Sequence, residues 1–363
     1  MKNKLTLFLI CSTAIIASCQ NKEEKLKSKQ MQEKFEWSPG AGADPLYPME
    51  IYRCGFVYAD GDGVSPAAKA LLGGVWGTEN GSSVVGDREK PVPVELQISW
   101  LSYTENKFYR GHFKLPYDKM LKLFQQGIKT FDFEEGKGMV PNRYEYDDIV
   151  AGLAPGGVVV VWVEGAGSTI DVGRFQVDET KIDMMDFAPD AWTHDQNKYV
   201  EGMMGYEKAA VANLAKNRIP LGLWDRYRER FNQRPIIKFD QSHPVETGAI
   251  YLGYFNGEAE VNYDEKYQKN YFKPRARVKI MNLGWTDTYA GKSQDYALHI
   301  NFDEREMFKA YKEAYGNKPE QEGQLVVEIN RGNDRYKVYL KVGDKKIEML
   351  KHQGEIMFDN RNK

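Results

Sequence analysis

The sequence predicts an α+β fold, built mainly of antiparallel sheets with packed helices. Three observations support this. Short segments of alternating apolar and polar residues recur along most of the chain, as is typical of half-buried strands. Only a few segments carry apolar residues at helical spacing. The 363 residues are 42% hydrophobic and include 17 Phe, 22 Tyr and 7 Trp, which can form a sizeable core and exclude disorder over most of the chain.

The N-terminus has the composition of a secretory signal. Lys2 and Lys4 precede an apolar run from Leu5 to Ala17, which is too short to span a membrane because a span needs about 20 residues. Small residues before Cys19 form a bacterial lipoprotein box, in which the thiol is acylated and the chain is cut just before it. We expect residues 1–18 to be a lipoprotein signal peptide and acylated Cys19 to hold the protein on a lipid bilayer. An ordinary cleaved signal or a short buried helix is the alternative.

Cleavage there has consequences for charge and thiol chemistry. It leaves 345 residues with a formal charge of −4 instead of −2, because two lysines leave with the signal. This balance argues against nucleic acid as a partner, since nucleic-acid binding needs a basic face. Cys11 is removed and Cys19 carries lipid, so Cys54 is left as the free thiol. Cys54 lies in an alternating segment, where we expect a buried and inert side chain.

Residues 19–36 are predicted to be a flexible charged tether. The stretch Gln20–Lys34 is rich in lysine and glutamate and has almost no apolar residue, so burial cannot offset its ordering entropy. Its first residues resemble the export signal of surface lipoproteins. We therefore expect an outer-membrane protein in the cell envelope, facing either the surface or the periplasm.

The rest of the chain divides into three predicted units, namely an N-terminal α+β module over 37–180, a helical connector over 181–240 and a C-terminal α+β module over 241–363. Alternation predicts strands in the first module over 94–100, 107–115, 146–152 and 170–177. The apolar run over 156–163 predicts a strand buried on both faces. Helical spacing predicts helices over 117–127, 203–216, 221–231 and 304–315. Further strands are expected over 250–255, 275–281, 296–302, 325–329, 335–342 and 345–350.

The order of elements is alike in the two α+β modules. With an offset of 187, residues of the first predicted helix fall on similar residues of the last, namely Met120 on Met307, Leu121 on Phe308, Lys122 on Lys309 and Phe124 on Tyr311. Trp100 and Trp285 precede the two helices at similar distances. These matches favour an internal duplication, and chance likeness between two α+β segments is the alternative. A duplication predicts two similar modules, each a curved sheet with one helix packed on it.

Two segments resemble a known family. They are Pro93–Ser102, followed by Phe108 and Tyr109, and Tyr146–Trp162 with its Ala-Pro-Gly-Gly-Val stretch. Both are similar to the family called domain of unknown function 2931, over about residues 50–240 and more weakly beyond. The resemblance implies a bacterial protein, and many members carry lipoprotein signals, in agreement with Cys19. The family has no established activity, so no catalytic residue carries over, although an immunity lipoprotein near secreted-effector genes is one role that it suggests.

Metal and cofactor motifs are missing from the sequence. The five histidines are far apart, with no His-x-x-x-His pair and no Cys-x-x-Cys pair. Asp60-Gly61-Asp62-Gly63 is similar to the start of a calcium loop but lacks the later ligands, which favours a turn. Gly165–Thr169 lacks the second glycine of a nucleophile elbow. We therefore expect no metal and no cofactor.

Charged residues offer weaker signals. Carboxylate pairs such as Asp147 and Asp148 suit acid–base chemistry on glycans only if they converge, and exposed acidic turns are far commoner. The arginine series at 226, 228, 230 and 234 is predicted to be a solvated helix face.

The most cleft-like mixture of polar and aromatic residues lies between the two modules. It comprises Asp183, Asp186, Trp192 and His194. We consider these four residues a candidate ligand or partner site, with ordinary loop packing as the alternative. The sequence thus favours a non-catalytic binding or immunity-type protein of the cell envelope, which recognises a protein or a glycan. The alternative is an envelope hydrolase acting on glycan or peptidoglycan through scattered Asp, Glu and His residues, and a structural envelope component is the third hypothesis.

Overall fold

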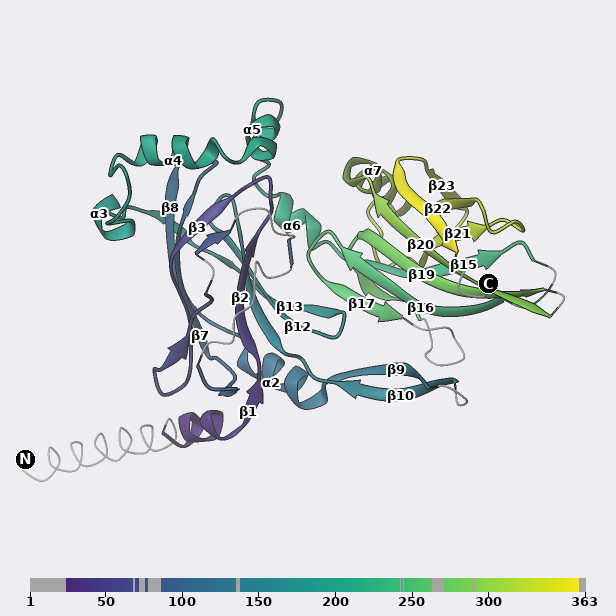
Figure 1. The fold of residues 1–363 in the computed structure, drawn as a ribbon, viewed down its shortest axis with the longest axis horizontal. Coiled ribbons are helices and arrows are strands. Elements are labelled where there is room, and N and C mark those ends of the chain that lie inside the picture. Colours follow the sequence, from purple (N-terminus) through teal and green to yellow (C-terminus); the bar gives the residue numbers. More distant parts are fainter. Residues whose placement is uncertain are drawn as a thin grey trace, which may run out of the picture.

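The computed structural model describes residues 24–67, 69–71, 76–77, 86–134, 138–241, 243, 245–262, 271–289 and 291–358. The predicted signal peptide and Cys19 lie outside these residues. The fold is α+β, with mostly antiparallel sheets and a few packed helices (Figure 1), as the sequence predicts. No helix in the described part of the chain is both long enough and apolar enough to cross a membrane.

The N-terminal half is a sandwich of two sheets, on the left of Figure 1. One sheet has the order β14-β8-β7-β3-β4, and β5 also pairs with β3. Its strands are β3 (Met49–Val57), β4 (Gly63–Val64), β5 (Ala70–Leu71), β7 (Glu95–Ser102), β8 (Lys107–Lys114) and β14 (Asp178–Thr180). The facing sheet begins with the order β2-β11-β12-β13, and β2 runs parallel to β11. These strands are β2 (Ser38–Ala43), β11 (Asp148–Ala154), β12 (Val158–Gly165) and β13 (Ser168–Gln176).

Strand β12 explains how the sandwich connects to the rest of the molecule. Val159, Val161 and Val163 point into the core of the N-terminal sandwich. Val160 and Trp162 point the other way, into a second core that continues through the C-terminal half. Side chains alternate across a strand, so a strand covered on both faces needs an unbroken apolar run. The prediction of a strand buried on both faces is confirmed.

The C-terminal half continues the second sheet. From β13 the nine-stranded sheet runs on as β17-β16-β19-β20-β24, and it faces a five-stranded sheet of order β18-β15-β21-β22-β23. The continuing strands are β16 (Val245–Tyr254), β17 (Ala259–Asn262), β19 (Val278–Tyr289), β20 (Lys292–Phe302) and β24 (His352–Phe358). The facing strands are β15 (Phe231–Phe239), β18 (Lys273–Arg275), β21 (Gly323–Ile329), β22 (Tyr336–Val342) and β23 (Lys345–Met349). Strand β15 runs parallel to β21.

In each half, one helix follows the central antiparallel strands in the chain, α2 after β8 and α7 after β20. Helix α2 (Tyr117–Gln126) buries Met120 and Phe124. Helix α7 (Glu304–Tyr315) buries Met307 and Tyr311, and it has the bounds that the sequence predicts. The carboxylate of Asp303 accepts a hydrogen bond from the backbone N–H of Glu306 at 2.9 Å, which caps the start of α7.

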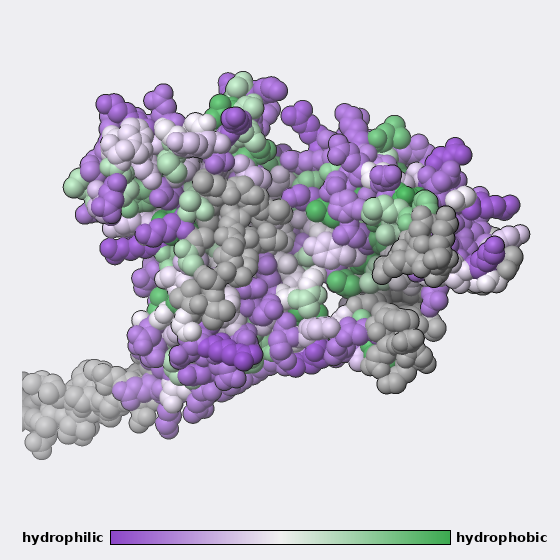
Figure 2. Space-filling model, viewed as in Figure 1, coloured by the Kyte–Doolittle hydropathy of each residue, from purple (hydrophilic) through white to green (hydrophobic). Residues whose placement is uncertain are grey.

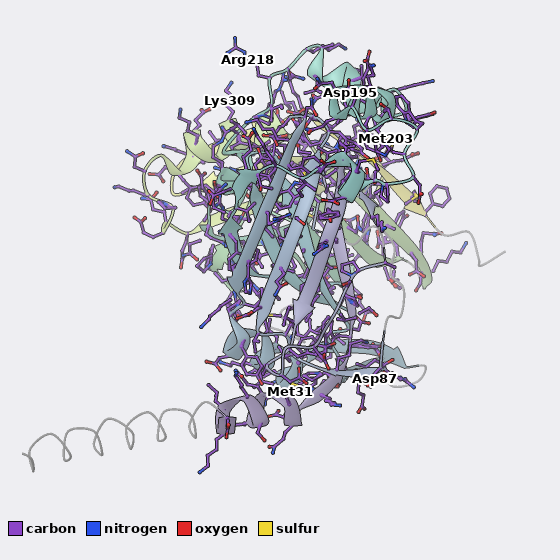
Figure 3. All side chains as sticks on the ribbon, turned by 90° about the vertical axis from the view of Figure 1, so that its left-hand side faces the viewer. Met31, Asp87, Asp195, Met203, Arg218 and Lys309 are labelled. Atoms are coloured by element: carbon purple, nitrogen blue, oxygen red, sulfur yellow. The ribbon has the colours of Figure 1, made fainter. Side chains whose placement is uncertain are left out.

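The helical connector crosses one end of the N-terminal half. It contains α3 (Met184–Phe187), α4 (Gln196–Met204), α5 (Lys208–Leu214) and α6 (Leu223–Tyr227). Figure 3 shows Asp195, Met203 and Arg218 of this segment at the end of the sheets opposite Met31 and Asp87. Hydrophobic side chains gather on α5 in Figure 2, on a surface that is otherwise largely hydrophilic.

The structure places the end of the connector earlier than the predicted boundary at residue 240. Strand β15 begins at Phe231 and belongs to the C-terminal half. Pro235 obscures this in the sequence, because proline usually interrupts a sheet. Strand β18 pairs only with residues 231–233 of β15, so no residue of β18 stands opposite Pro235 and the ladder with β21 continues on the other side.

The described part of the predicted tether is regular rather than coil. Residues 24–32 are helical, and β1 (Lys34–Glu36) pairs with β6 (Glu89–Pro91). Contacts with the folded body hold this segment, since the ring centroids of Phe35 and Phe124 on α2 are 5.2 Å apart and Gln125 donates a hydrogen bond to Glu33. A separate hairpin, of β9 (Ile128–Glu134) and β10 (Gly138–Tyr144), follows α2.

The two halves have the same strand order. In each half, the first strand lies in one sheet and the next three long strands form the other sheet. One helix follows, and three strands then return to the sheet of the first strand, the first of them parallel to it. A final strand pairs at the edge of the other sheet. In this correspondence β2 matches β15, β3 matches β16, β7 matches β19, β8 matches β20, α2 matches α7, β11 matches β21, β12 matches β22, β13 matches β23 and β14 matches β24.

The register of the central hairpins also agrees. Trp100 pairs with Tyr109 across β7 and β8, and Trp285 pairs with Tyr296 across β19 and β20. In both pairs the rings are stacked with centroids 5.3 Å apart. The evolutionary duplication itself stays a prediction.

Candidate functional site

The candidate residues of the connector have local contacts. Asp183 precedes α3, and its carboxylate accepts a hydrogen bond from the backbone N–H of Met185 at 2.8 Å, an N-cap contact. Asp186 is exposed in the first turn of α3, where the helix dipole favours a negative charge. Both carboxylates therefore have structural explanations.

Trp192 and His194 also serve the local fold. The indole of Trp192 is 67% exposed and lies against Gly202 of α4, where a larger residue would collide with it. The Nε2 atom of His194 is 3.1 Å from the carbonyl oxygen of Pro189. None of the three cavities described below is lined by these two residues or by the two aspartates. The four side chains therefore lie outside these three cavities.

Other residues singled out in the sequence have equally simple roles. Cys54 is buried in β3, and burial raises the pKa of its thiol to about 12, so it carries no reactive thiolate. The carboxylate of Asp60 accepts a hydrogen bond from the N–H of Asp62 at 3.0 Å, which makes the acidic segment a turn. Among the described residues no three His, Cys, Asp or Glu side chains lie close enough to hold a metal.

The largest of the three cavities lies in the C-terminal half and has a volume of about 1160 Å³. It opens between β24 and the loop that joins β21 to β22, and the end of β15 forms its third side. The lining is a mixture of polar and aromatic side chains that includes Asp240, Asn330, Asn333, Arg335, Tyr336 and His352. Such a mixture suits a ligand with both apolar surface and hydrogen-bonding groups.

A buried hydrogen-bond network fixes one wall of this cavity. The amide oxygen of Asn333 accepts a hydrogen bond from the Trp285 indole at 3.0 Å, and its amide nitrogen donates to Asp287 at 2.6 Å. His243 contacts the other carboxylate oxygen of Asp287. Burial alone raises the pKa of Asp287, but the hydrogen bonds from His243 and Asn333 outweigh it and lower that pKa. The loop carrying Asn333 is therefore held by an ionised carboxylate.

The opposite wall is built on β24. The hydroxyl of Tyr336 lies 3.0 Å from Nδ1 of His352, and burial lowers the pKa of His352. Gly354 leaves room for the Tyr336 ring, since a Cβ atom there would collide with the Tyr336 hydroxyl. Tyr336 of β22 thereby joins the five-stranded sheet to β24 of the nine-stranded sheet at one end of the cavity. Among the described residues no strand pairs with the outer edge of β24.

Two smaller cavities lie elsewhere in the molecule. One, of about 610 Å³, lies on the outer face of the nine-stranded sheet, and Met357 of β24 is in its lining. The other, of about 390 Å³, lies near the first residues of the described chain and is lined by Met31, Asp60 and Asp87, among others.

Buried carboxylates at the junction of the two halves are neutralised by arginines. Asp171 of β13 pairs with Arg228 at 2.6 Å, and Glu258 pairs with Arg230 at 2.5 Å. The prediction of a solvated helix face holds for Arg226, which is exposed on α6, but it is wrong for Arg228 and Arg230, because α6 ends at Tyr227 and these two arginines pair with carboxylates at the junction. Their partners are tens of residues away in the sequence, so no local pattern indicates the pairing.

Glu260 is a further neutralised carboxylate. Its oxygen lies 2.5 Å from Nε of Arg275, and Lys273 is a second cationic partner. Burial opposes ionisation, but the two cations outweigh it and lower the pKa of Glu260 to about 2. A carboxylate held ionised in this way cannot serve as a general acid near neutral pH.

A different arrangement lies between the halves, around Lys279 of β19. Asp44 follows β2 and Glu304 begins α7, so the two carboxylates come from opposite halves. Burial raises the pKa of both Asp44 and Glu304 and lowers the pKa of Lys279, whose positive charge interacts with both carboxylates. The Tyr227 hydroxyl partly offsets the rise in the pKa of Glu304. Perturbed groups of this kind are the ones an acid–base reaction needs.

Sequence reasoning misses both the cavity and the Lys279 cluster. The cavity is built from residues between 238 and 358, and the cluster from residues 44, 279 and 304. The likeness of the two halves was visible in the sequence, but the correspondence of β14 with β24 follows from the strand order of the sheets.

Comparison with known proteins yields one family. Residues 20–222 match the family model described as Protein of unknown function (DUF2931). No curated protein and no solved structure matches the chain. The match covers the N-terminal half and most of the connector, and the cavity lies beyond it.

Proposed function

The chain belongs to the DUF2931 family of proteins of unknown function, and from that premise we propose that it is an outer-membrane lipoprotein that binds an envelope ligand without catalysis. The anchor is acylated Cys19, which follows a signal-like segment. The ligand is a protein or a glycan of the cell envelope, as in an immunity-type protein.

The position of the described N-terminus supports an orientation for this protein. Cys19 precedes the helical residues 24–32 by a few residues, and Met31 lies at the end of the N-terminal half away from Asp195 (Figure 3). A lipid on Cys19 would hold that end beside the bilayer. The connector would then point away from the membrane.

One observation carries the binding role, namely the 1160 Å³ cavity with its fixed polar wall. Asn333 is buried and held by Trp285 and Asp287, so its contacts with a ligand would need little reorganisation. The buried carboxylates Asp171, Glu258 and Glu260 are engaged by cations. These features favour recognition over acid–base chemistry.

Binding can be tested on the full chain in detergent, with soluble peptidoglycan fragments and a peptide library as probes. Asn333→Gly removes the cavity amide and tolerates the φ of 50° at this position. Asn106→Gly is the matched control, because Asn106 also has a positive φ, of 53°, and lies in the N-terminal half. We expect Asn333→Gly to weaken binding at least tenfold and Asn106→Gly to leave it unchanged. Equal binding by both variants, or no binding of either probe class by the wild type, overturns the proposal.

The anchor has a separate test. Cys19→Ala should move the protein from the membrane fraction to the soluble fraction or leave it as an unprocessed precursor without lipid, because the acylated thiol is lost. Labelling with a radioactive fatty acid followed by membrane fractionation measures this. Lipid labelling that persists in Cys19→Ala contradicts the anchor.

An envelope hydrolase is the second candidate, and the Lys279 cluster favours it. Two carboxylates with raised pKa values near a lysine are suited to donate and accept a proton. If this proposal is right, the wild type cleaves peptidoglycan, and both Glu304→Gln and Asp44→Asn abolish the cleavage. A wild type that releases no fragments from peptidoglycan contradicts it.

A further inference from the structure

Strand β24 is an edge strand with one open side. It pairs with β20 over all seven residues from His352 to Phe358, and among the described residues no strand pairs with its other side. In an antiparallel pair, alternate residues direct their backbone N–H and C=O groups away from the partner. Strand β24 therefore presents a regular row of backbone donors and acceptors.

This edge lacks the features that usually prevent strand pairing. Proteins protect edges with short strands, prolines, bulges and charges. Strand β24 has no proline, its register with β20 is continuous, and Glu355 is its one carboxylate. Met357 and Phe358 are 54% and 60% exposed. The corresponding strand β14 is three residues long and reads Asp-Glu-Thr, so it is a protected edge.

The two faces of β24 adjoin different hollows. Ile356 and Phe358 line the 1160 Å³ cavity, and Glu355 lies at its border, whereas Met357 lines the 610 Å³ hollow on the outer face of the sheet. A strand added beside β24 would direct successive side chains alternately toward these two hollows. Recognition by strand addition works in this way, with backbone hydrogen bonds for affinity and alternating pockets for specificity.

We propose that β24 binds an extended segment of a partner polypeptide as the tenth strand of the sheet. This rests on the proposed binding function and names its ligand as a protein, because a glycan lacks a matching row of backbone groups. Glu355 is exposed at the middle of the strand, so charge complementarity favours a Lys or Arg opposite it, with apolar residues on both sides.

The same carboxylate argues against a second copy of this chain as the occupant. In a twofold pairing centred on the middle of β24, Glu355 would stand opposite Glu355 of the other copy. Like charges directly opposite each other destabilise a sheet. Charge complementarity with Glu355 therefore favours a polypeptide that carries a Lys or Arg over a second copy in this register.

The test uses two libraries of nine-residue peptides on the full chain in detergent, one with Lys and one with Glu fixed at the centre. We expect binders from the Lys library and a reversed preference, by at least tenfold, in Glu355→Lys. Ile356→Lys and Met357→Lys should each weaken binding at least tenfold, because they place a charge at the edge or in a hollow. Leu350→Lys is the matched control, since Leu350 is 79% exposed just outside the strand, and it should bind as the wild type.

A second measurement separates strand addition from ordinary pocket binding. N-methylation of the selected peptide at successive residues should reduce binding with a period of two, because only alternate N–H groups face β24. No binders in either library, binders unaffected by Ile356→Lys and Met357→Lys, or methylation without that period each overturn the proposal. A dimer that Met357→Lys converts to a monomer, without peptide binding, also overturns it in favour of self-association.

Failure of strand addition can be distinguished from failure of the proposed function. Binding of peptidoglycan fragments that is lost in Asn333→Gly, without peptide binding, overturns strand addition alone. Absence of both kinds of binding overturns both proposals.

Discussion

The two halves of the molecule share a strand order but differ at one corresponding edge. In the N-terminal half, β14 ends the sheet after three charged or polar residues, and the connector begins directly after it. In the C-terminal half, β24 runs for seven residues, with two exposed apolar side chains near its end. The first edge is protected and the second is open.

The outer faces of the central hairpins differ in the same sense. Leu101 pairs with Phe108 in the N-terminal half, and both are buried beneath the connector helices. The corresponding pair in the C-terminal half is Thr286 and Asp295, which are joined by a hydrogen bond of 2.6 Å on the exposed face. Each face matches its covering, because a buried hairpin needs apolar side chains and a solvated one tolerates polar side chains.

One strand order therefore ends in a protected edge in one half and in an open edge in the other. The family match ends at residue 222, so it includes the closed half and most of the connector but not the open half. We infer that the first half anchors and supports, and that the second half recognises a partner.

The largest expected effect comes from the paired tryptophans. Trp100→Ala and Trp285→Ala each remove a buried ring stacked on a tyrosine, and each should cost about 3–5 kcal/mol of unfolding free energy. Urea denaturation measures both. A cost below about 1 kcal/mol for one of them would break the equivalence of the two hairpins.

The connector should distinguish the two outer faces. Phe108→Asp places an unpaired charge beneath α4 and should cost about 3 kcal/mol, together with faster proteolysis of the connector. The mirrored change, Asp295→Phe, should stay within about 1 kcal/mol because that face is solvated. Similar losses in the two variants would contradict the assignment of a covered and an open face.

The junction between the halves should be sensitive to Asp171. Asp171→Ala leaves the guanidinium of Arg228 without its carboxylate and should cost about 2 kcal/mol, less than a fully buried pair because Arg228 is one-third exposed. Exposed Asp225→Ala, which removes the partner of Arg174, is the control and should cost about 0.5 kcal/mol. Equal costs would show that the buried pair does not stabilise the junction.

The smallest effect concerns the cavity wall. The lowered pKa of Asp287 means that its contribution to stability is present above the ordinary carboxyl pKa and is lost as the pH falls through the lowered value. The unfolding free energy from urea denaturation should therefore fall more for the wild type than for Asp287→Asn between about pH 6 and about pH 3. Parallel curves for the two proteins would exclude Asp287 as the group responsible.

Local patterns predicted much of the fold. The bounds of α7 follow from helical spacing and its Asp303 cap, and the valine run of β12 predicts burial on both faces. The parallel pairing of β15 with β21 joins residues about 90 positions apart, so Pro235 seemed to interrupt a strand that its distant partner stabilises. Arg228 and Arg230 were misassigned for the same reason, since their carboxylates are distant in sequence. The cavity could not be predicted because it depends on the packing of three separate segments.

Hydrogen–deuterium exchange of the free, full-length chain tests the central claim most directly. We expect amides along His352–Phe358 to alternate between slow exchange, where they bond to β20, and fast exchange on the open side. The fast set should become slow when a selected peptide is added. Uniformly slow exchange along β24 in the free protein would contradict the account, because it would mean that the edge is already covered.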